Sequence, residues 1–210
     1  MATNIAVLVS GGGTNLQALI DAESRGELGG GKITAVISTK KGAYALERAK
    51  NAGIPGYVIP RKEFDSVHTM TVTLVNKLRE LNIDLVVLAG CMTIFTEELI
   101  EAYPNAIMNV HPALIPSFCG KGYYGLRVHE EALKYGVKVS GATVHFVTEE
   151  CDGGPIIAQE PVPVLSDDTP ETLQKRIMEQ GEWIALPRAV SLFCQGRISV
   201  EGRTVIIKEN

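Results

Sequence analysis

The first part of the chain, up to about residue 90, alternates between short apolar runs and segments with helical spacing. Four runs have the length and composition of buried strands: residues 5–9, 33–38, 57–59 and 84–90. Residues 43–52 and 66–81 lie between these runs and favour helices. Alternating strands and helices are typical of a parallel sheet, and continuously apolar strands fit a sheet that helices cover on both faces. The sequence therefore predicts an α/β fold with a doubly wound, Rossmann-like, mostly parallel central sheet.

The rest of the chain predicts further elements of the same domain. Strands are expected over 106–111, 142–147 and 156–164, and helices over 96–102, 128–135 and from 168 or 169 to 194. Thr96 is the expected N-cap of the first of these helices, and Pro170 suits the first turn of the last. Residues 198–207 predict a hairpin that turns at 201–203. No repeat, low-complexity tract or linker interrupts the pattern, so we expect one domain over 1–210.

Composition excludes several classes of partner. Charged residues make up 21% of the 210 positions and the net charge is −4, which argues against a general nucleic-acid binder. No apolar run approaches the roughly 20 residues of a membrane span, and the N-terminus lacks a signal-peptide pattern. The four cysteines are widely spaced and carry no metal-binding pattern. We expect a cytoplasmic protein that has free thiols and binds no metal. Its oligomeric state, monomer or homodimer, is left open.

A glycine-rich segment follows the first predicted strand and leads into a helix. The glycines of this segment, the last of which are Gly12 and Gly13, let the backbone approach a ligand closely. Thr14 and Asn15 add side-chain donors at the helix N-terminus. The dinucleotide fingerprint is not met, because Leu16 stands where its third glycine belongs, and the Gly-Lys-Ser/Thr of a P-loop is missing. The pattern favours a loop that binds a phosphomonoester. The alternative is a turn needed only for tight strand-to-helix packing.

Asn109 and His111 are the strongest catalytic candidates. Residues two apart in a strand share a face, and Pro112 ends this strand, so both side chains are expected to project from a strand end. Open α/β sheets bind ligands at such ends. An amide polarises a carbonyl, and an imidazole holds or passes a proton near neutral pH. These features predict acyl chemistry. No Gly-x-Ser-x-Gly elbow or activated cysteine is evident, which favours direct transfer without a covalent enzyme intermediate.

Asp152 lies in a glycine-flanked turn and is the expected carboxylate partner of His111, whose charged form it would favour. The alternative is an aspartate that only stabilises the turn. His145 falls on a predicted strand, where a satisfied core histidine and a functional one remain equally open. His68 and His129 are expected at the surface.

Four stretches together carry a resemblance: residues 10–19, 109–116, 141–147 and 152–155. Their order and their Asn-x-His-Pro and Asp-Gly-Gly-Pro motifs resemble the phosphoribosylglycinamide formyltransferase family over essentially the whole chain. The resemblance implies the formyltransferase fold and transfer of a formyl group from 10-formyltetrahydrofolate to the amine of glycinamide ribonucleotide in purine biosynthesis. Rival interpretations are a formyltetrahydrofolate hydrolase, a methionyl-tRNA formyltransferase and a non-catalytic phosphometabolite-binding protein on the same scaffold.

The resemblance also implies roles for individual residues. It assigns catalysis to Asn109, His111 and Asp152. It assigns the ribonucleotide to Gly12, Gly13, Thr14, Asn15 and Glu182. It assigns the folate to Met92, Thr93, Ile94, Asn109, Thr143, His145, Cys151 and Asp152. Residues 1–100 would then form the ribonucleotide-binding half and residues 101–210 the folate-binding and catalytic half. The apolar residues among 91–95 could line a pocket for a flat ligand, and the alternative is that they only pack in the core.

The sequence departs from the family pattern at three places. Val67 stands where many members have an arginine that holds the phosphate, and Arg61, Lys62 or His68 are the candidates to replace it. Thr93 also stands where an arginine is frequent. Residues 117–125 are longer than the usual connection, and a mobile flap and an inert surface excursion are both open.

Overall fold

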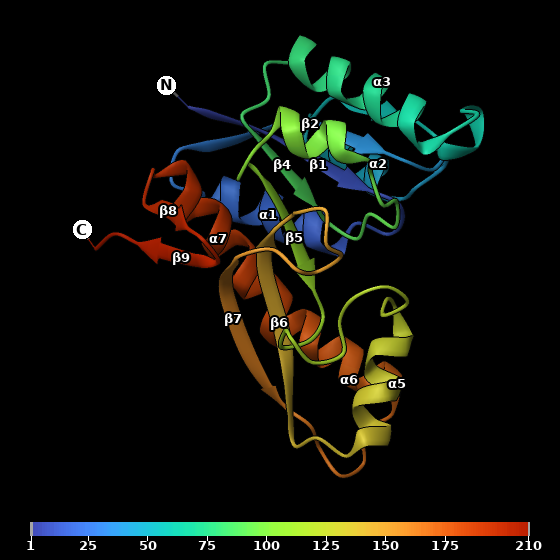
Figure 1. Cartoon of the computed structure of the whole chain (residues 1–210), viewed down its shortest axis with the longest axis vertical. Helices are drawn as coiled ribbons and strands as arrows, with labels where there is room; N and C mark the ends of the chain where they lie inside the picture. Colours follow the sequence, from blue (N-terminus) through green and yellow to red (C-terminus); the bar gives the residue numbers. More distant parts are fainter. Residues whose placement is uncertain (1, 210) are drawn as a thin grey trace.

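The computed structural model describes residues 2–209, which form nine strands in one sheet with the order β3-β2-β1-β4-β5-β6-β7-β9-β8 (Figure 1). The strands are β1 (Thr3–Val9), β2 (Gly31–Ser38), β3 (Gly56–Val58), β4 (Leu85–Leu88), β5 (Ile107–His111), β6 (Val139–Phe146), β7 (Ile156–Pro163), β8 (Ile198–Glu201) and β9 (Thr204–Ile207). The α-helices are α1 (Thr14–Ser24), α2 (Ala45–Asn51), α3 (Val67–Glu80), α4 (Glu97–Ala102), α5 (Leu126–Tyr135), α6 (Pro170–Ile177) and α7 (Trp183–Cys194).

The parallel part of the sheet reverses its strand order between β1 and β4. The strands β3, β2, β1, β4 and β5 are all parallel, and β1 lies between β2 and β4. The loops that follow β1 and β4 therefore leave neighbouring strand ends. Such a switch point is where open α/β sheets bind their ligands. The prediction of a mostly parallel, doubly wound sheet is confirmed.

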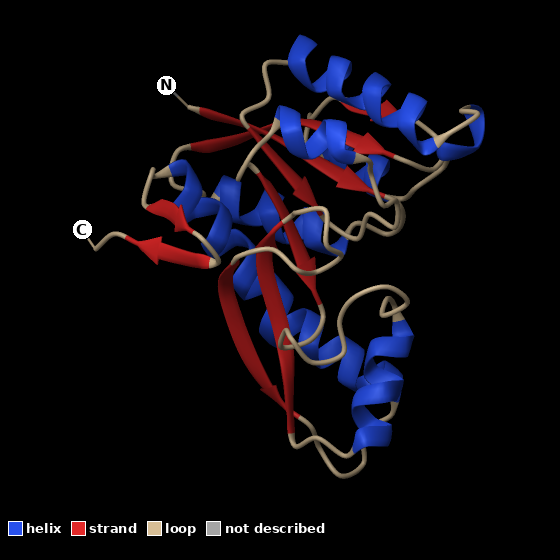
Figure 2. Ribbon diagram, in the orientation of Figure 1, coloured by secondary structure: helices blue, strands red, loops and turns tan. Residues whose placement is uncertain are grey.

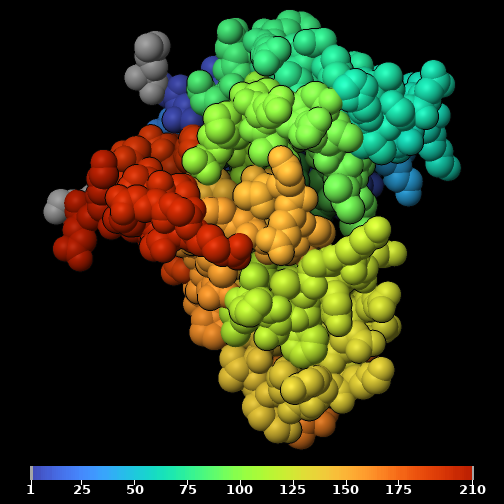
Figure 3. All heavy atoms as spheres, in the orientation of Figure 1, coloured from blue at the N-terminus to red at the C-terminus, as the bar shows by residue number. Residues whose placement is uncertain are grey.

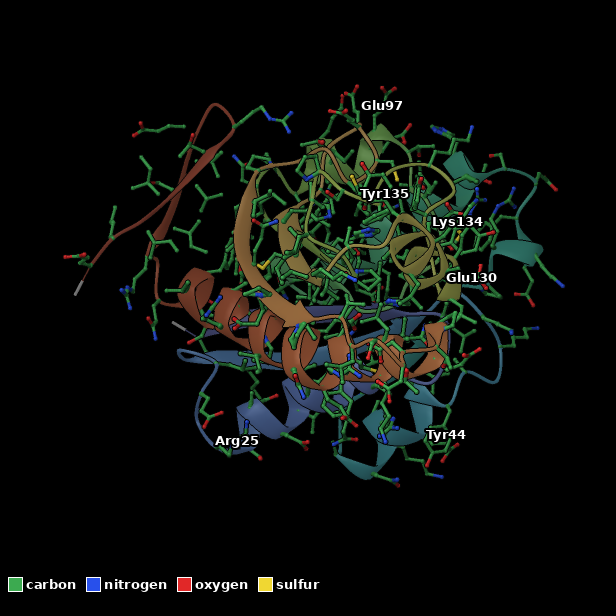
Figure 4. The ribbon with its side chains drawn as sticks, turned by 90° about the horizontal axis from the view of Figure 1, so that it is seen from below. Arg25, Tyr44, Glu97, Glu130, Lys134 and Tyr135 are labelled. Carbon is green, nitrogen blue, oxygen red and sulfur yellow. The ribbon has the colours of Figure 1, made fainter. Side chains whose placement is uncertain are left out.

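Helices cover both faces of the sheet (Figure 2). One core forms where α1, α2 and α7 pack on the strands, with Leu16, Leu19 and Ala185 fully buried. The other forms where α3 and α4 pack on the opposite face, with Met70 and Leu74 buried. Figure 4 shows the two sides, with Arg25 and Tyr44 beyond α1 and α2 and Glu97 opposite. Apolar strands buried on both faces account for the uninterrupted hydrophobic runs in the sequence.

A third core lies at the far end of the long β6–β7 hairpin, where α5 and α6 pack against it and form the lower lobe of Figure 1. Its buried members are Ala132, Ala142, Val162, Leu173 and Ile177. Both β6 and β7 are antiparallel to their neighbours on the β5 side, so β6 pairs Asn109 with His145 and His111 with Thr143. The hairpin thereby places side chains of β6 next to the polar pair of β5.

The predicted long helix after residue 168 differs in the structure. Thr169 caps α6 by accepting a hydrogen bond from the Thr172 amide, with Pro170 in the first turn as expected. The helix then passes through a π-helical turn, Met178–Glu182, before α7 begins. The buried residues Ile177 and Gly181 are four apart across this turn, a spacing that an α-helix also shows, so the sequence pattern does not distinguish the two. Such turns are frequent at functional sites.

Two further predictions concern helix ends and membrane spans. Thr96 precedes α4 as predicted, but its hydroxyl donates to the Glu98 carboxylate and does not cap the helix. The C-terminal hairpin is confirmed, and β9 attaches it to β7. Among residues 2–209, the structure contains no helix with the length and apolarity needed to cross a membrane.

Candidate active site

A cavity of about 1200 Å³ opens where the ends of β1, β4 and β5 meet the turn between β6 and β7. In Figure 3 the surface is hollowed beside the orange turn at 147–155, between green spheres above and yellow-green spheres below. Most of the residues proposed from the sequence line it: Thr14, Asn15, Met92, Thr93, Ile94, Asn109, His111, His145, Cys151, Asp152 and Glu182. Segments that are distant in the sequence thus meet in one cavity.

Three predicted residues lie outside the lining of this cavity. Gly12 and Gly13 belong to the loop that leads into α1 at the cavity end marked by Thr14. Thr143 is fully buried on β6, where its hydroxyl donates to the Ala113 carbonyl and accepts from the Ile115 amide. Thr143 therefore holds the loop that follows β5.

The polar centre of the cavity joins Asn109, His111, His145 and Asp152. His111 Nδ1 lies 3.5 Å from Asp152 Oδ2, and His145 Nε2 lies 3.6 Å from Asp152 Oδ1. Asn109 Nδ2 donates to His145 Nε2 over 3.2 Å, while His145 Nδ1 donates to the Phe146 carbonyl over 2.8 Å. His145 thus fixes the amide of Asn109, and the satisfied histidine is also part of the site.

Residues 117–125 reach the same cluster through their backbone. The Phe118 carbonyl accepts from His111 Nε2 over 2.8 Å, and the Gly120 amide donates to Asp152 Oδ2 over 2.8 Å. Gly120 and Lys121 line the cavity, as do Tyr123 and Tyr124. The extra segment is therefore a wall of the site. Its mobility stays a prediction.

Burial and charge act in opposite directions on the two central groups. His111 is only 4% exposed, and this burial lowers its pKa below the usual 6.5, although the Asp152 charge and the Phe118 carbonyl oppose the shift. Burial alone would raise the pKa of Asp152, but the neighbouring His145 and His111 and a hydrogen bond from the Gly120 amide bring it below its usual value. Asp152 favours the charged form of His111 as expected, but burial has the larger effect and sets the net direction of the shift.

The predicted surface position of His129 is wrong. It was expected at the surface, but it is fully buried on α5 and lines the cavity. Neither of its ring nitrogens has a hydrogen-bond partner, and burial, followed by repulsion from His111, lowers its pKa to about 4. The helical spacing carried a signal, because His129 lies three residues before the buried Ala132 and so shares its face. His68 is exposed as predicted and pairs with Glu98.

We expect His129 to make the protein acid-sensitive. A histidine whose pKa drops from 6.5 to about 4 on folding stabilises the native state fully above pH 6.5, and this stability is lost as the pH falls toward 4. At pH 5 the free energy of unfolding should be lower by about 2 kcal/mol than at pH 7.5 from this group. Urea unfolding at both pH values measures the difference.

The matched variants for this test are His129→Gln and His68→Gln. His129→Gln should flatten the pH dependence, whereas His68→Gln, at an exposed histidine, should retain it. Equal pH dependence in wild type and His129→Gln would contradict the assignment.

The opposite end of the cavity suits an anion. Gly13 precedes α1 with φ 73°, a left-handed conformation that favours glycine, and no side chain caps the helix. Space is open beside the α-carbons of Gly11 and Gly12. Asn15 Nδ2 donates to Glu182 Oε2 over 2.6 Å, and burial raises the pKa of Glu182 against this bond. The π-helical turn therefore delivers a carboxyl group to the anion-binding loop.

Arg48 contacts this loop and was missed by the sequence reasoning. Its Nε donates to the Gly12 carbonyl over 2.8 Å. Of the three candidates for the missing arginine, Arg61 is engaged with the Phe64 carbonyl and His68 with Glu98. Arg48 lies on another helix 36 residues along the chain from Gly12, and no local pattern points to it.

Comparison with known proteins shows the family of the chain. The sequence pattern of a family described as "Formyl transferase" matches residues 3–190. The chain belongs to the formyl transferase family. A phosphoribosylglycinamide formyltransferase from Haemophilus influenzae is 42% identical over 197 residues, which cover 94% of this chain and 90% of that protein. The chloroplastic phosphoribosylglycinamide formyltransferase of Vigna unguiculata is 38% identical, and the match covers 92% of this chain but spans 62% of that longer relative.

Solved structures of formyl transferase family members share the fold. Glycinamide ribonucleotide transformylase 1 from Symbiobacterium toebii superposes with a TM-score of 0.93 at 42% identity, covering 99% of this chain and 95% of that chain. The family resemblance and the fold class inferred from the sequence are confirmed.

Proposed function

We propose that this chain transfers the formyl group of 10-formyltetrahydrofolate to the amine of glycinamide ribonucleotide in purine biosynthesis. The observation that carries the proposal is the cluster of Asn109, His111 and Asp152 in one cavity. The cavity has an anion-binding loop at one end and an apolar loop at the other. Its two ends match a phosphorylated acceptor and a flat, largely apolar donor.

The ribonucleotide occupies the end formed by the N-terminal loop. Its phosphate lies against the backbone of Gly12 and Gly13 with Thr14 and Asn15, because unpaired amides at a helix N-terminus favour anions. Glu182, already bonded to Asn15, engages the ribonucleotide through its carboxylate.

The folate occupies the end formed by the loop after β4. Met92 and Ile94 are 57% and 68% exposed and line the cavity with Thr93, so apolar side chains face the space a pterin would fill. Cys151 and His145 complete this side, and Thr143 acts through the loop that it holds. Residues 1–100 thus serve mainly the ribonucleotide and 101–210 mainly the folate and catalysis, with Glu182 and the 91–96 loop crossing this division.

The reaction proceeds by direct attack. The amine nitrogen forms a bond to the formyl carbon, and the carbonyl electron pair moves to oxygen. Asn109 Nδ2, held by His145, and the Nδ1–H of protonated His111, whose charged form Asp152 favours, donate to this developing oxyanion. Asp152 takes a proton from the attacking nitrogen through a water molecule and returns it to folate nitrogen 10 as the carbon–nitrogen bond to the donor breaks. A neutral amine and an ionised Asp152 satisfy this proton balance.

Location in the cytoplasm and a monomeric or dimeric state are part of the same proposal. The calculated charge and the elements of residues 2–209 are compatible with either state.

The deciding experiment follows release of the deformylated folate spectroscopically. Purified protein is mixed with 10-formyltetrahydrofolate, with and without glycinamide ribonucleotide. Release that requires the ribonucleotide supports the proposal. Release that ignores it identifies a formyltetrahydrofolate hydrolase, and absence of release with both ligands bound identifies a non-catalytic binding protein.

Glu182→Gln is expected to raise the KM for glycinamide ribonucleotide by about tenfold and to leave the folate KM unchanged. The carboxylate contributes a charge-assisted hydrogen bond of about 1.5–3 kcal/mol that the amide does not replace. Steady-state kinetics with each substrate varied in turn measures this effect.

Glu179→Gln is the matched control, because Glu179 lies in the same π-helical turn but is exposed and outside the cavity lining. An equal rise of both KM values would contradict a ribonucleotide-specific role for Glu182.

A further inference from the structure

One serine bridges the two ends of the cavity. Ser10 follows β1 and directly precedes the glycines of the anion-binding loop. Its Oγ accepts from the Met92 backbone amide over 3.0 Å, across 82 residues of sequence. The contact is possible because β1 and β4 are neighbouring parallel strands that pair Leu8 with Leu88, so the loops that follow them start side by side.

The backbone of the loop after β4 has few other hydrogen bonds, although Cys91 and Phe95 pack against the core. Before it, the Ala89 amide bonds to the Leu8 carbonyl, and after it, the Thr96 amide bonds to Thr71 Oγ1. Within residues 2–209, Ser10 is the only residue outside this loop that hydrogen-bonds its backbone between 90 and 95. Its apolar side chains at 92 and 94 are more than half exposed. Few anchors and exposed side chains are properties of a segment that a ligand orders.

Thr39 holds Ser10 in place. Its hydroxyl lies 2.8 Å from Ser10 Oγ at the end of β2 and is buried. A serine hydroxyl has one hydrogen and two lone pairs, so Ser10 can share a hydrogen bond with the Thr39 hydroxyl while it accepts from Met92. The three groups form a chain from β2 through the anion-binding loop to the apolar loop.

We infer that Ser10 is a positioning residue that couples binding of the two substrates. This inference rests on the proposed function, because it needs a phosphate at the glycine loop and a folate at the apolar loop. A phosphate that fixes the glycines also fixes Ser10, and thereby the Met92 amide. The second ligand then meets a loop that is already ordered and binds more tightly. Thermodynamic linkage makes the effect reciprocal.

The test measures a binding cycle by calorimetry. The probes are glycinamide ribonucleotide and 5,8-dideazafolate, a folate analogue without a formyl group, each titrated alone and in the presence of the other at saturation. In the wild type each ligand should raise the affinity of the other by the same factor, about three- to tenfold, as expected for one hydrogen bond. In Ser10→Ala this factor should approach one.

Two variants separate coupling from a structural role. Ser10→Thr keeps the hydroxyl and should retain the factor. Thr39→Val keeps the shape of its side chain but releases Ser10, and should reduce the factor.

If Ser10 had a purely structural role, Ser10→Ala would weaken the affinity for each ligand by the same amount whether or not the other ligand is bound. The coupling factor would then be unchanged in Ser10→Ala, and this result would overturn the inference. A wild type that transfers formyl groups with a factor of one overturns the inference alone. A wild type that neither binds the ribonucleotide nor transfers overturns the proposed function as well.

Discussion

His111→Ala is expected to lower kcat for formyl transfer by about 10³-fold, with the KM of each substrate changing less than about threefold. Removing one preorganised donor to an oxyanion typically costs about 10²–10³ in kcat, and His111 also lies in the proton path beside Asp152. The side chain is buried in the wall between β5 and residues 117–125, so water cannot take its place with the same orientation. Stopped-flow or steady-state assays with saturating substrates measure the effect.

Two further variants make the result specific to this imidazole. His111→Gln retains an N–H donor of similar reach and should recover part of the rate. His68→Ala removes an exposed histidine that also lines the cavity and should leave kcat within about twofold. Retention of more than a tenth of the activity in His111→Ala would place the oxyanion donors elsewhere.

The parallel half of the fold could be predicted because the signals for its strands and helices lie within short stretches of sequence. The strands β1, β2 and β4 are buried on both faces, and each therefore appears in the sequence as an unbroken apolar run. The step from strand to glycine loop to helix is also local. The pairing of Asn109 with His111 followed from the two-residue repeat of a strand.

The remaining features of the site depend on contacts between distant segments. His145 meets Asn109 through the register of an antiparallel pair, which no local pattern specifies. The contributions of Phe118 and Gly120 come from backbone groups, which every residue type except proline possesses in full. The lowered pKa of His111 depends on the residues that cover it, which the neighbouring carboxylate alone does not reveal.

Asp152 has two functions that one substitution separates. As a hydrogen-bond acceptor it holds the Gly120 amide, and as a charge it lies near both His111 and His145. In Asp152→Asn the amide oxygen can still accept from Gly120, so the wall formed by residues 117–125 is retained. The negative charge and the proton acceptor are lost.

Asp152→Asn is therefore expected to lower kcat by about 10²–10³-fold and to change its pH dependence. In the wild type, one limb of the profile should follow the titration of His111, whose pKa lies below its usual value. The charge of Asp152 raises the pKa of His111, so its removal should move this limb to lower pH. Profiles of kcat from pH 5 to about 8 measure both effects. Glu149→Gln, which removes an exposed charge from the same turn, should shift the limb little. A His111 limb that stays at the same pH in Asp152→Asn would contradict this coupling.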